Sequence, residues 1–529
     1  AIVGEFSFRL VRTPNQGLAR ARNVGLAEAT GEFVAYVDDD ARPDPHWLHA
    51  LVETFSRGYL GVGGPNLPPQ ADGDIAHCVA NAPGGPTHVL ISDLEAEHLP
   101  GCNMAFRTDA LRAIGGFDPA FRIAGDDVDV CWRLLRYGKL GFSPAAVVWH
   151  HRRDSVRGYW RQQREYGRAE ALLERKWPAK YNAGGHVSWG GRVYGRGLAA
   201  RLGIRRRIRY GTWGSAEFQT TDPGEPGMLT SLPGTPEWYL VLAGLGVLAA
   251  LSAAWRPLLL VLPLLALAAL ALVLRGVHGG RAATFRARPR GLRGFVLRAL
   301  VGCLHLLQPL ARLRGRLTEG LSPWRRRGPS GFVLAMPGQR TVWTESWQPP
   351  TQRLRTIGRA LLGDGASVLR GGEFDRWELE VRAGAFGGAR LRMAVEEHGH
   401  GRQFARFRVW PRVSRLTFLL LAILAPLATL AALDGAYVAA ALLGALGTAV
   451  AVATVTETGR ATCAFLRSLD RLARGEDVPP VDLPPIESRV RSEEPAGNGR
   501  RRQALDPSLL EVLANERLGE PATRRGART

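Results

Sequence analysis

The spacing of apolar residues changes along the chain. Residues 1–195 carry short apolar runs that alternate with amphipathic segments, which predicts strands alternating with helices. Such alternation is typical of an α/β domain in which helices cover both faces of a mostly parallel sheet. Residues 238–274 and 416–455 instead contain long apolar runs that have no polar face. The pattern therefore predicts an α/β domain followed by membrane segments.

Helix ends in the first region are predicted from residues that commonly cap helices. A helix is expected from Asn15, as its capping residue, to about Ala29. Thr108 and Asp126 are expected to cap two later helices. Between the first of these helices and the others, Glu32 to Val37 is predicted to be a buried strand, because it is rich in Phe, Val and Tyr.

Each of the two apolar regions splits into two runs. Trp238 to Ala254 and Pro257 to Leu274 are separated by Trp255-Arg256, and Leu416 to Leu433 and Ala436 to Val455 are separated by Asp434-Gly435. Runs of about 17–18 residues are near the lower limit for crossing roughly 30 Å of hydrocarbon. The sequence therefore predicts two membrane hairpins. A buried helical core is the alternative, which the missing polar face disfavours.

The basic residues suggest how these hairpins are oriented. The chain has 529 residues and a formal net charge of +21, and its only lysines are Lys139, Lys176 and Lys180. Thirteen arginines and one acid lie between residues 275 and 327, whereas the turns inside the hairpins carry only Arg256 and Asp434. The positive-inside rule therefore places all large segments in the cytoplasm. Gly294 to Leu313 is predicted to be an interfacial amphipathic helix, with a fifth span as the alternative.

Composition excludes several classes of protein. The five cysteines form no Cys-x-x-Cys pattern, which argues against a disulfide scaffold. The apolar content of 46% is enough for a buried core, so global disorder is not expected. A basic chain could bind nucleic acid, but the arginines gather at the membrane flanks and not in a groove with aromatic residues. Nucleic acid is therefore not an expected partner.

Between the hairpins, Gly338 to Arg412 alternates like β structure. His398-Gly399-His400-Gly401 is predicted to be the turn between the last two strands, and a metal site at its two histidines is the less favoured alternative. The tail from about Val478 is rich in Pro, Arg and Glu and is predicted to be disordered. Three sets of apolar residues are each expected to share a sheet face: Trp377, Leu379 and Val381; Leu391, Met393 and Val395; Phe407 and Val409.

Three aspartates, Asp38-Asp39-Asp40, follow the strand that ends at Val37. Ligands of open α/β sheets bind beyond the carboxyl ends of the strands. Asp38 and Asp40, two positions apart on an extended segment, would point the same way and could share a divalent ion. Carboxylate oxygens suit Mg²⁺ or Mn²⁺. A solvated acidic turn is the alternative.

A second acidic cluster, Asp126-Asp127-Val128-Asp129, opens a predicted helix. One carboxylate there is explained as a helix cap, but three are more than capping requires. The positive end of the helix would keep an aspartate ionised, as a general base must be before it accepts a proton. His150 follows the next predicted strand, Leu140 to Trp149.

The ordered set of these motifs resembles the family 2 glycosyltransferases over about residues 10–175. The first half carries Asn15-x-Gly17-x-x-x-Ala21-Arg22-Asn23-x-Gly25 and then Gly31-Glu32-Phe33-Val34-Ala35-Tyr36-Val37-Asp38-Asp39-Asp40. The second half carries Gly101-Cys102-Asn103-Met104-Ala105-Phe106-Arg107, Gly115-Gly116-Phe117-Asp118, Gly125-Asp126-Asp127-Val128-Asp129 and Val148-Trp149-His150.

The resemblance implies a GT-A fold, which is Rossmann-like, and inverting transfer from a nucleotide sugar. It implies that Asp38 and Asp40 hold Mn²⁺ or Mg²⁺ on the donor diphosphate, that His150 completes the metal shell, and that Asp127 is the catalytic base. The residues assigned to donor binding are Asn15, Gly17, Arg22, Asn23, Asp38 and Asp39. The residues assigned to the acceptor side are Gly101, Asn103 and Asp126.

Three features depart from the family pattern. Asp126 stands where the family usually has Glu. The chain, which starts at Ala1 without a signal peptide, is expected to begin after the family's first strand. Arg161-Gln162-Gln163-Arg164-Glu165-Tyr166 is similar to the Gln-x-x-Arg-Trp segment of processive synthases but does not match it, so processive synthesis is not predicted.

Together these observations predict a multi-pass enzyme of the bacterial inner (cytoplasmic) membrane with a cytoplasmic catalytic domain. It would transfer sugar to a lipid-linked or polysaccharide acceptor in cell-surface polysaccharide synthesis, and polysaccharide-assembly proteins are further candidate partners. The alternative is a non-catalytic membrane scaffold of an envelope assembly complex. The expected segments are a transferase domain (1–195), a basic linker (196–237), hairpin 1 (238–274), an Arg-rich interfacial segment (275–337), a β-rich segment (338–412), hairpin 2 (416–455) and a tail (456–529).

Overall fold

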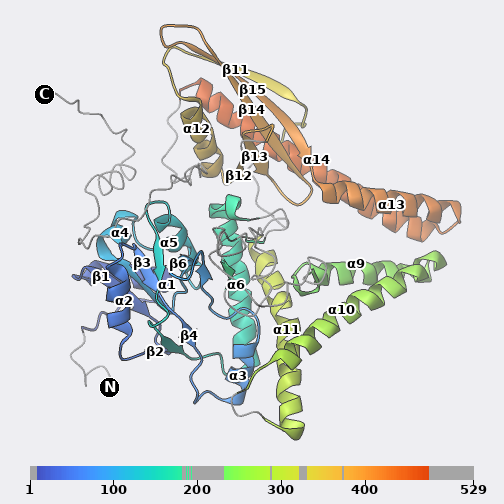
Figure 1. The fold of residues 1–529 in the computed structure, drawn as a ribbon. Helices are drawn as coiled ribbons and strands as arrows, with labels where there is room; N and C mark the ends of the chain where they lie inside the picture. The colour runs from blue at the N-terminus through green and yellow to red at the C-terminus, as the bar shows by residue number, and fades with distance from the viewer. Residues whose placement is uncertain are drawn as a thin grey trace, which may run out of the picture.

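The computed structural model describes residues 9–181, 186–187, 189, 192–193, 232–285, 289–320, 331–371 and 375–475 (Figure 1). Most of the predicted basic linker and the tail from residue 476 onward lie outside these residues. The described part contains an N-terminal α/β domain, a group of long apolar helices, and a second sheet that adjoins two of those helices.

The α/β domain is built on a seven-stranded sheet. Its strands, in spatial order, are β1 (Phe33–Val37), β7 (Asn103–Arg107), β3 (Gly61–Gly63), β8 (Leu140–Phe142), β6 (Glu95–His98), β5 (Val89–Leu90) and β10 (Arg192–Val193). The predicted α/β class is confirmed, but the expectation of a mostly parallel sheet is wrong, because only β3 and β8 pair in parallel. Four residues separate β5 from β6, and so short a connection allows only antiparallel pairing.

Helices cover both faces of this sheet, as expected. One face packs against α1 (Leu18–Glu28), α4 (Thr108–Ala113) and α5 (Asp126–Leu134), around Met104, Phe106 and Leu140. The other face packs against α2 (Trp47–Phe55), around Val62 and Ala105. The two helices α3 (Asp74–Asn81) and α6 (Val156–Lys176) lie at one side of the sheet (Figure 1).

The segment predicted as one strand, residues 140–149, is divided between the large sheet and a second, three-stranded sheet. That segment forms two strands in different sheets, β8 and β9 (Val148–His150). β9 lies between β2 (Ala41–Pro43) and β4 (Asn66–Leu67), and the pairing of β2 with β9 sets Ala41 opposite His150. His150 is thereby fixed beside the aspartates that precede β2.

The three predicted helix caps are wrong. Gly17, Arg107 and Gly125 occupy the N-cap positions of α1, α4 and α5, and none of these helices has a side-chain cap. Asn15 instead accepts a hydrogen bond from the Gly17 amide (3.2 Å). Gly17 and Gly125 have φ values of 99° and 89°, a backbone region that other residues rarely adopt. The chain enters both helices through a turn that requires glycine, which leaves the nearby polar side chains free for other contacts.

Long apolar helices follow the α/β domain. They are α9 (Trp238–Ala250), α10 (Val261–Ala282), α11 (Gly291–Glu319), α13 (Arg415–Leu433) and α14 (Tyr437–Ala473). Among the described residues, four helices are long and apolar enough to cross a membrane, namely those over 256–282, 291–319, 415–433 and 437–473, which indicates membrane association. The apolar helix at Trp238–Ala253 is shorter, because the chain turns at Trp255 and continues through Pro257.

The turns of the two helical pairs meet. Trp255 donates a hydrogen bond from Nε1 to Oδ2 of Asp434 (2.9 Å), and Trp255 and Leu258 pack against Ala431 and Ala439. In Figure 1, α9, α10 and α13 point away from the α/β domain toward the same side, whereas α11 runs alongside α6.

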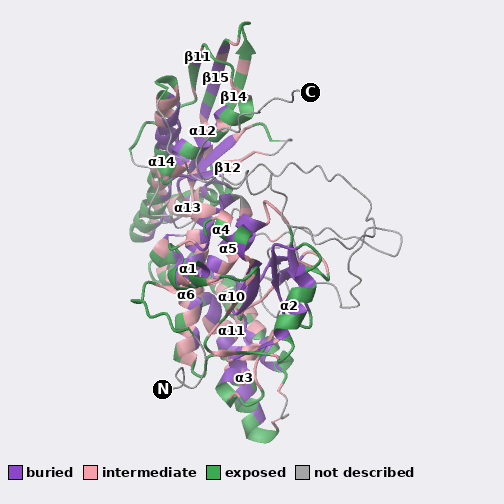
Figure 2. Cartoon of the chain, turned by 90° about the vertical axis from the view of Figure 1, so that its left-hand side faces the viewer, coloured by how far each residue is buried: buried purple, intermediate pink, exposed green. Residues whose placement is uncertain are grey.

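The second sheet has five antiparallel strands. In spatial order they are β11 (Gly338–Thr344), β15 (Gln403–Val413), β14 (Gly387–Glu397), β13 (Leu379–Arg382) and β12 (Ser367–Arg370). The predicted hairpin turn at residues 398–401 is confirmed, because β14 pairs directly with β15. Buried and exposed positions alternate along β15, and the buried face packs against α12 (Pro350–Gly363) and the C-terminal half of α14 (Figure 2).

Candidate active site

Two acidic clusters from distant parts of the sequence lie around one buried arginine. The first follows β1, where Asp38 and Asp40 turn toward His150 at the end of β9. His150 Nε2 lies 3.1 Å from Asp40 Oδ1 and 3.9 Å from Asp38 Oδ2. One ligand atom from each of the three residues falls within 4.8 Å of the others, so they form a candidate metal site.

Arg22 connects this site to the second cluster. Its side chain is 6% exposed and lies on the buried face of α1. Its guanidinium donates to Asp126 Oδ2 (2.5 Å), to the Gly101 carbonyl (3.0 Å) and to Asp38 Oδ1 (3.4 Å). A single cation therefore compensates carboxylates from both clusters, which could not otherwise lie so close together.

Asp127 is held by different partners from Asp126. Its Oδ2 accepts a hydrogen bond from the Gly101 amide (3.0 Å), and His98 Nε2 lies 3.4 Å from the same oxygen. The His98 ring is nearly buried at the end of β6, and its Nδ1 lies 3.0 Å from the carbonyl oxygen of Thr87. That carbonyl can only accept, so Nδ1 carries a hydrogen and Nε2 is the atom that faces Asp127.

These surroundings shift the pKa values of Asp126 and Asp127 in opposite directions. Burial raises the pKa of Asp126 to about 6, despite the adjacent Arg22. Burial also opposes ionisation of Asp127, but the positive charge of a His98 imidazolium at 3.4 Å, the charge of Arg22 and the Gly101 amide lower its pKa to about 2. Asp127 is therefore the member of the pair that stays ionised when the pH falls well below 6.

The pKa values of Asp38 and Asp40, the two carboxyls of the candidate metal site, are also shifted in opposite directions. Burial raises the pKa of Asp38, although Arg22 and His150 act against it. The hydrogen bond from His150 lowers the pKa of Asp40. A divalent cation would favour the ionised form of both groups and would relieve the repulsion between them.

The donor set fits a hard divalent cation through its two carboxylates. Arg152 NH1 lies 2.7 Å from His150 Nδ1, and a guanidinium can only donate, so the ring hydrogen sits on Nε2. Nε2 would have to lose that hydrogen before it could bind a metal. His150 therefore fits as a ligand only when its contact with Arg152 opens.

The sequence comparisons assign a family to this region. Residues 1–115 match the model of Glycosyl transferase family 2. The N-terminal region is a family 2 glycosyltransferase domain. A pre-mycofactocin glycosyltransferase of Mycobacterium tuberculosis is 32% identical over 175 residues, which cover 31% of this chain and 37% of that protein.

More distant relatives share the same region. The glucosyl-dolichyl phosphate glucuronosyltransferase of Haloferax volcanii is 28% identical over 23% of this chain and 42% of its own length. The succinoglycan biosynthesis protein ExoM of Rhizobium meliloti is 30% identical over 27% of this chain and 47% of its own length. The chain thus spans less than half the length of these relatives. A solved structure of GalNAc-T7 with UDP, GalNAc and Mn²⁺ aligns at a TM-score of 0.22 and 18% identity, over 31% of this chain and 35% of that one.

Within the family 2 domain, several residues expected to bind the donor have structural contacts. The Asn23 carboxamide donates to the Phe117 carbonyl and accepts from the Phe117 amide, both at 2.7 Å. Gly17 packs so closely that an added Cβ would lie 2.9 Å from the Arg122 backbone. Asn15 and Asp39 are exposed.

The residues assigned to the acceptor side are mostly buried. Asn103 has no exposed surface, and its carboxamide bonds to Trp47, Pro65 and Ala146 at 2.8–3.0 Å. Asp126 is 1% exposed and faces Arg22. Only Gly101, through its amide and carbonyl, directly touches both Asp127 and Arg22. Asn103 and Asp126 therefore position the site from inside and do not offer a surface to an acceptor.

Sequence reasoning missed His98 and Arg152. His98 lies beside Asp127, and Arg152 lies beside His150; both Asp127 and His150 were predicted site residues. Arg152 could have been suspected from its place two residues after His150, whereas no spacing signal links His98 to Asp127, 29 positions later. Their contact depends on β6 lying beside the start of α5.

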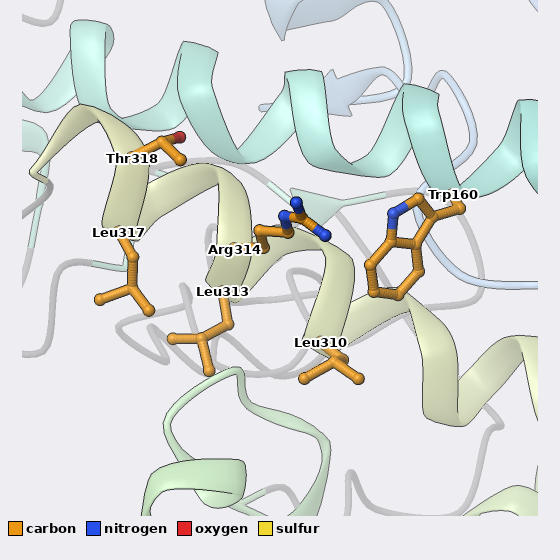
Figure 3. A pocket seen from close by; sticks show the side chains of 6 residues that line it. All are labelled: Trp160, Leu310, Leu313, Arg314, Leu317 and Thr318. Carbon is orange, nitrogen blue, oxygen red and sulfur yellow. The ribbon is translucent and has the colours of Figure 1, made fainter.

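A groove of about 440 Å³ lies apart from this site, between α6 and α11. Its lining residues are Trp160, Leu310, Leu313, Arg314, Leu317 and Thr318. Figure 3 shows the three leucines on one side of α11, and the Arg314 side chain extends toward Trp160. The groove contains none of the candidate site residues.

Proposed function

We propose that this chain is an inverting, metal-dependent glycosyltransferase that acts at the cytoplasmic face of a bacterial inner membrane. It would transfer sugar from a nucleotide-sugar donor to a lipid-linked or polysaccharide acceptor during cell-surface polysaccharide synthesis. The observation that carries the proposal is the junction at Arg22, whose bonds to Asp38 and Asp126 hold the candidate metal site beside the cluster that contains Asp127.

The metal side would stabilise the leaving group. Asp38, Asp40 and, once released from Arg152, His150 would hold Mn²⁺ or Mg²⁺, and the ion would neutralise charge on the departing nucleoside diphosphate. Arg22 already pairs with two carboxylates, so we assign it to holding the clusters together and not to direct diphosphate binding.

Asp127 would act as the general base. Its low pKa keeps it ionised, and the Gly101 amide and His98 fix its Oδ2. It would take the proton from the acceptor hydroxyl as that oxygen attacks the anomeric carbon. Because the attack and the departure occur on opposite faces of that carbon, a single displacement inverts its configuration.

The apolar helices would tie this domain to the membrane. The turns of both hairpins meet at Trp255 and Asp434, so both would lie on one side of the bilayer, and the arginine-rich segments would face the cytoplasm on the other side. We assign α11 to the interface, because 44% of its most apolar stretch is buried, against 17–22% in the other three long helices, and because it packs on α6. Trp160 and the leucines beside Arg314 are typical of such a position.

The relatives support the proposed classes of acceptor. One is named for a dolichyl phosphate substrate and another for succinoglycan synthesis, which are a lipid-linked and a polysaccharide system. A catalytic domain held at the bilayer would meet either kind of acceptor there.

The test is a screen of nucleotide-sugar donors with membranes that contain the full-length protein, with and without Mn²⁺. Transfer or donor hydrolysis should require the cation and should be lost in Asp127→Asn and Asp38→Ala. Asp93→Asn, an exposed acid in the β5–β6 turn, is the matched control and should keep full activity. Unchanged turnover in both site variants would refute the residue assignment, and no turnover with any donor would favour the non-catalytic scaffold.

A further inference from the structure

The five-stranded sheet has a covered face and an open face. The covered face packs against α12 and α14, and Phe407 and Val409 of β15 are buried there. Successive side chains of a strand point to opposite faces, so Phe404, Arg406 and Arg408 lie on the open face. Arg406 and Arg408 are exposed, and Phe404 is half-buried. The mechanism proposed above uses none of these residues.

Aromatic rings gather at the end of the open face that adjoins the β14–β15 turn. Trp343 of β11 is directly opposite Phe404, with 6.2 Å between their ring centroids, and His398 of the turn lies 5.1 Å from Trp343. Trp343 is 46% exposed, and Trp347, beside Gly401 of the same turn, is 55% exposed. Exposed aromatic rings grouped in this way are typical of a binding surface. Their apolar faces can pack against the C–H groups of a sugar ring.

Two arginines on the open face lie directly opposite each other. They are Arg392 of β14 and Arg408 of β15, and both are exposed. Like charges at such positions destabilise an antiparallel pair. In the part of the chain that the structure describes, neither side chain forms an ion pair or a hydrogen bond. Glu378 is close enough to interact with the charge of Arg392, but it forms no ion pair with it and accepts a hydrogen bond from the Met393 amide (3.0 Å).

Other arginines on the open face are neutralised within the sheet. Arg406 pairs with Glu396 (2.9 Å). Glu380, which is 2% exposed, pairs with Arg390 (2.9 Å) and Arg412 (3.4 Å). The fold therefore supplies a carboxylate to these arginines but not to the opposed pair, whose two positive charges are left for a ligand.

The aromatic end of the face would stand away from the bilayer. Gly387, at the start of β14, packs against Thr454 and Thr458, where the apolar run of α14 ends. From Gly387 to Glu396, the residue paired with Phe404, the strand extends about 30 Å, at about 3.3 Å per residue. At the edge of the sheet, β12 contacts the turn Pro178–Lys180 of the glycosyltransferase domain. The open face is therefore beside that domain and beyond the reach of a lipid headgroup at its aromatic end.

We propose that the open face binds an anionic glycan. Sugar rings would pack against Trp343 and Phe404, and an acid group of the chain would bind Arg392 and Arg408, because guanidinium groups form paired hydrogen bonds with carboxylate and phosphate oxygens. Two uncompensated cations beside a larger uncharged surface suit a chain with widely spaced acid groups. A nucleic acid carries a phosphate on every nucleotide and would need more unpaired cations.

The choice of a glycan rests on the proposed function, since a growing acceptor is the chain that a glycosyltransferase holds beside it. The test measures binding and not activity. Full-length protein, in a detergent without a sugar headgroup and with EDTA to prevent metal-dependent binding at Asp38 and Asp40, is titrated by calorimetry. The probes are a hexasaccharide of galacturonic acid, a neutral hexasaccharide of glucose, a uridine hexanucleotide and short-chain phosphatidylglycerol.

The arginines and the tryptophan should have different effects. Arg392→Gln/Arg408→Gln should weaken binding of the acidic hexasaccharide by about 10-fold or more and leave the weaker binding of the neutral one unchanged. Trp343→Thr should weaken both by about 5-fold or more. The matched control is Arg355→Gln/Arg359→Gln, which removes two exposed arginines from α12 on the covered side and should bind like the parent.

The melting temperature separates binding from folding. Removing the opposed arginines should leave it unchanged or raise it, because it relieves their repulsion. A large fall would make the pair structural and overturn the proposal. Equal affinity in the arginine variant and its control, no saturable binding of the acidic hexasaccharide, or tighter binding of the hexanucleotide or the phospholipid would also overturn it. Retained glycan binding in a protein that turns over no donor would refute the proposed function alone.

Discussion

Replacing Arg22 with methionine tests whether one buried cation holds the candidate site together. The variant keeps an unbranched apolar stem but removes the guanidinium and all three of its hydrogen bonds, to Asp126, Gly101 and Asp38. Asp126 is 1% exposed and would remain without a counter-charge. Removing one partner of a buried pair costs about 3–5 kcal/mol. In a domain of this size we therefore expect the melting temperature to fall by about 6–20 °C.

The pH dependence has a defined sign. The pKa of Asp126 in the folded protein is already raised to about 6, above its value of about 4 in the unfolded chain. The folded state therefore holds the proton more tightly, so the unfolding free energy falls as pH rises from about 4 through 6. Without Arg22 this pKa rises further, since a favourable charge is lost. The deficit of Arg22→Met should thus be largest at pH 8 and smaller at pH 5.

Thermal unfolding of the full chain in detergent, followed by tryptophan fluorescence at both pH values, measures this effect. Arg20→Met is the matched control, because Arg20 is exposed on the same helix and, in the described part of the chain, its side chain hydrogen-bonds only to Gln16. It should stay within about 2 °C of the parent. Arg22→Met/Asp126→Asn should recover much of the loss. If the double variant melts as low as Arg22→Met, or if the deficit is equal at pH 5 and pH 8, an unpaired buried charge is not the cause.

Three further outcomes follow from the site. His98→Gln should raise the pKa of Asp127, so activity should fall more at pH 5 than at pH 8; parallel pH–rate profiles would contradict this. Asp40→Asn should raise the Mn²⁺ concentration for half-maximal activity by ~10-fold or more, and an unchanged Mn²⁺ titration would remove Asp40 from the metal site. Gly17→Ala should lower the melting temperature, because φ at Gly17 is 99° and the added Cβ would lie 2.9 Å from the Arg122 backbone. Gly25→Ala should not, because Gly25 lies within α1 and a Cβ there would have nothing within 4 Å. Equal shifts in the two variants would contradict the strain at Gly17.

Local pattern predicted the parts of the site that depend on a single element. The strand Phe33–Val37 ends at the aspartates as expected, because a short apolar run followed by acids is a local signal. The antiparallel strands β5 and β6 escaped prediction, since each is too short to show a period. The caps predicted at Asn15 and Asp126 failed because a glycine with positive φ can begin a helix without the side-chain bond that capping rules look for.

The parts of the candidate site that the sequence did not predict depend on contacts between residues far apart in the chain. The sequence offered two acidic clusters, but nothing in it showed that Arg22 would join them across 104 positions, or that His98 would face Asp127. Both contacts arise because the sheet order places strands from different parts of the chain side by side. The same order buried Asn103, which the family resemblance had assigned to the acceptor side.

The arginines show most clearly why counting charges along the chain was only partly informative. The segment from 275 to 327 was assigned to the membrane flank, yet Arg312 and Arg316 within it pair with Glu170 of α6, and Arg316 is 4% exposed. Those two charges fix α11 to the glycosyltransferase domain and are not available to lipid headgroups. The orientation argument therefore rests on the remaining arginines of that segment. An arginine paired with a carboxylate inside the protein, as Arg316 is with Glu170, is explained by the fold alone.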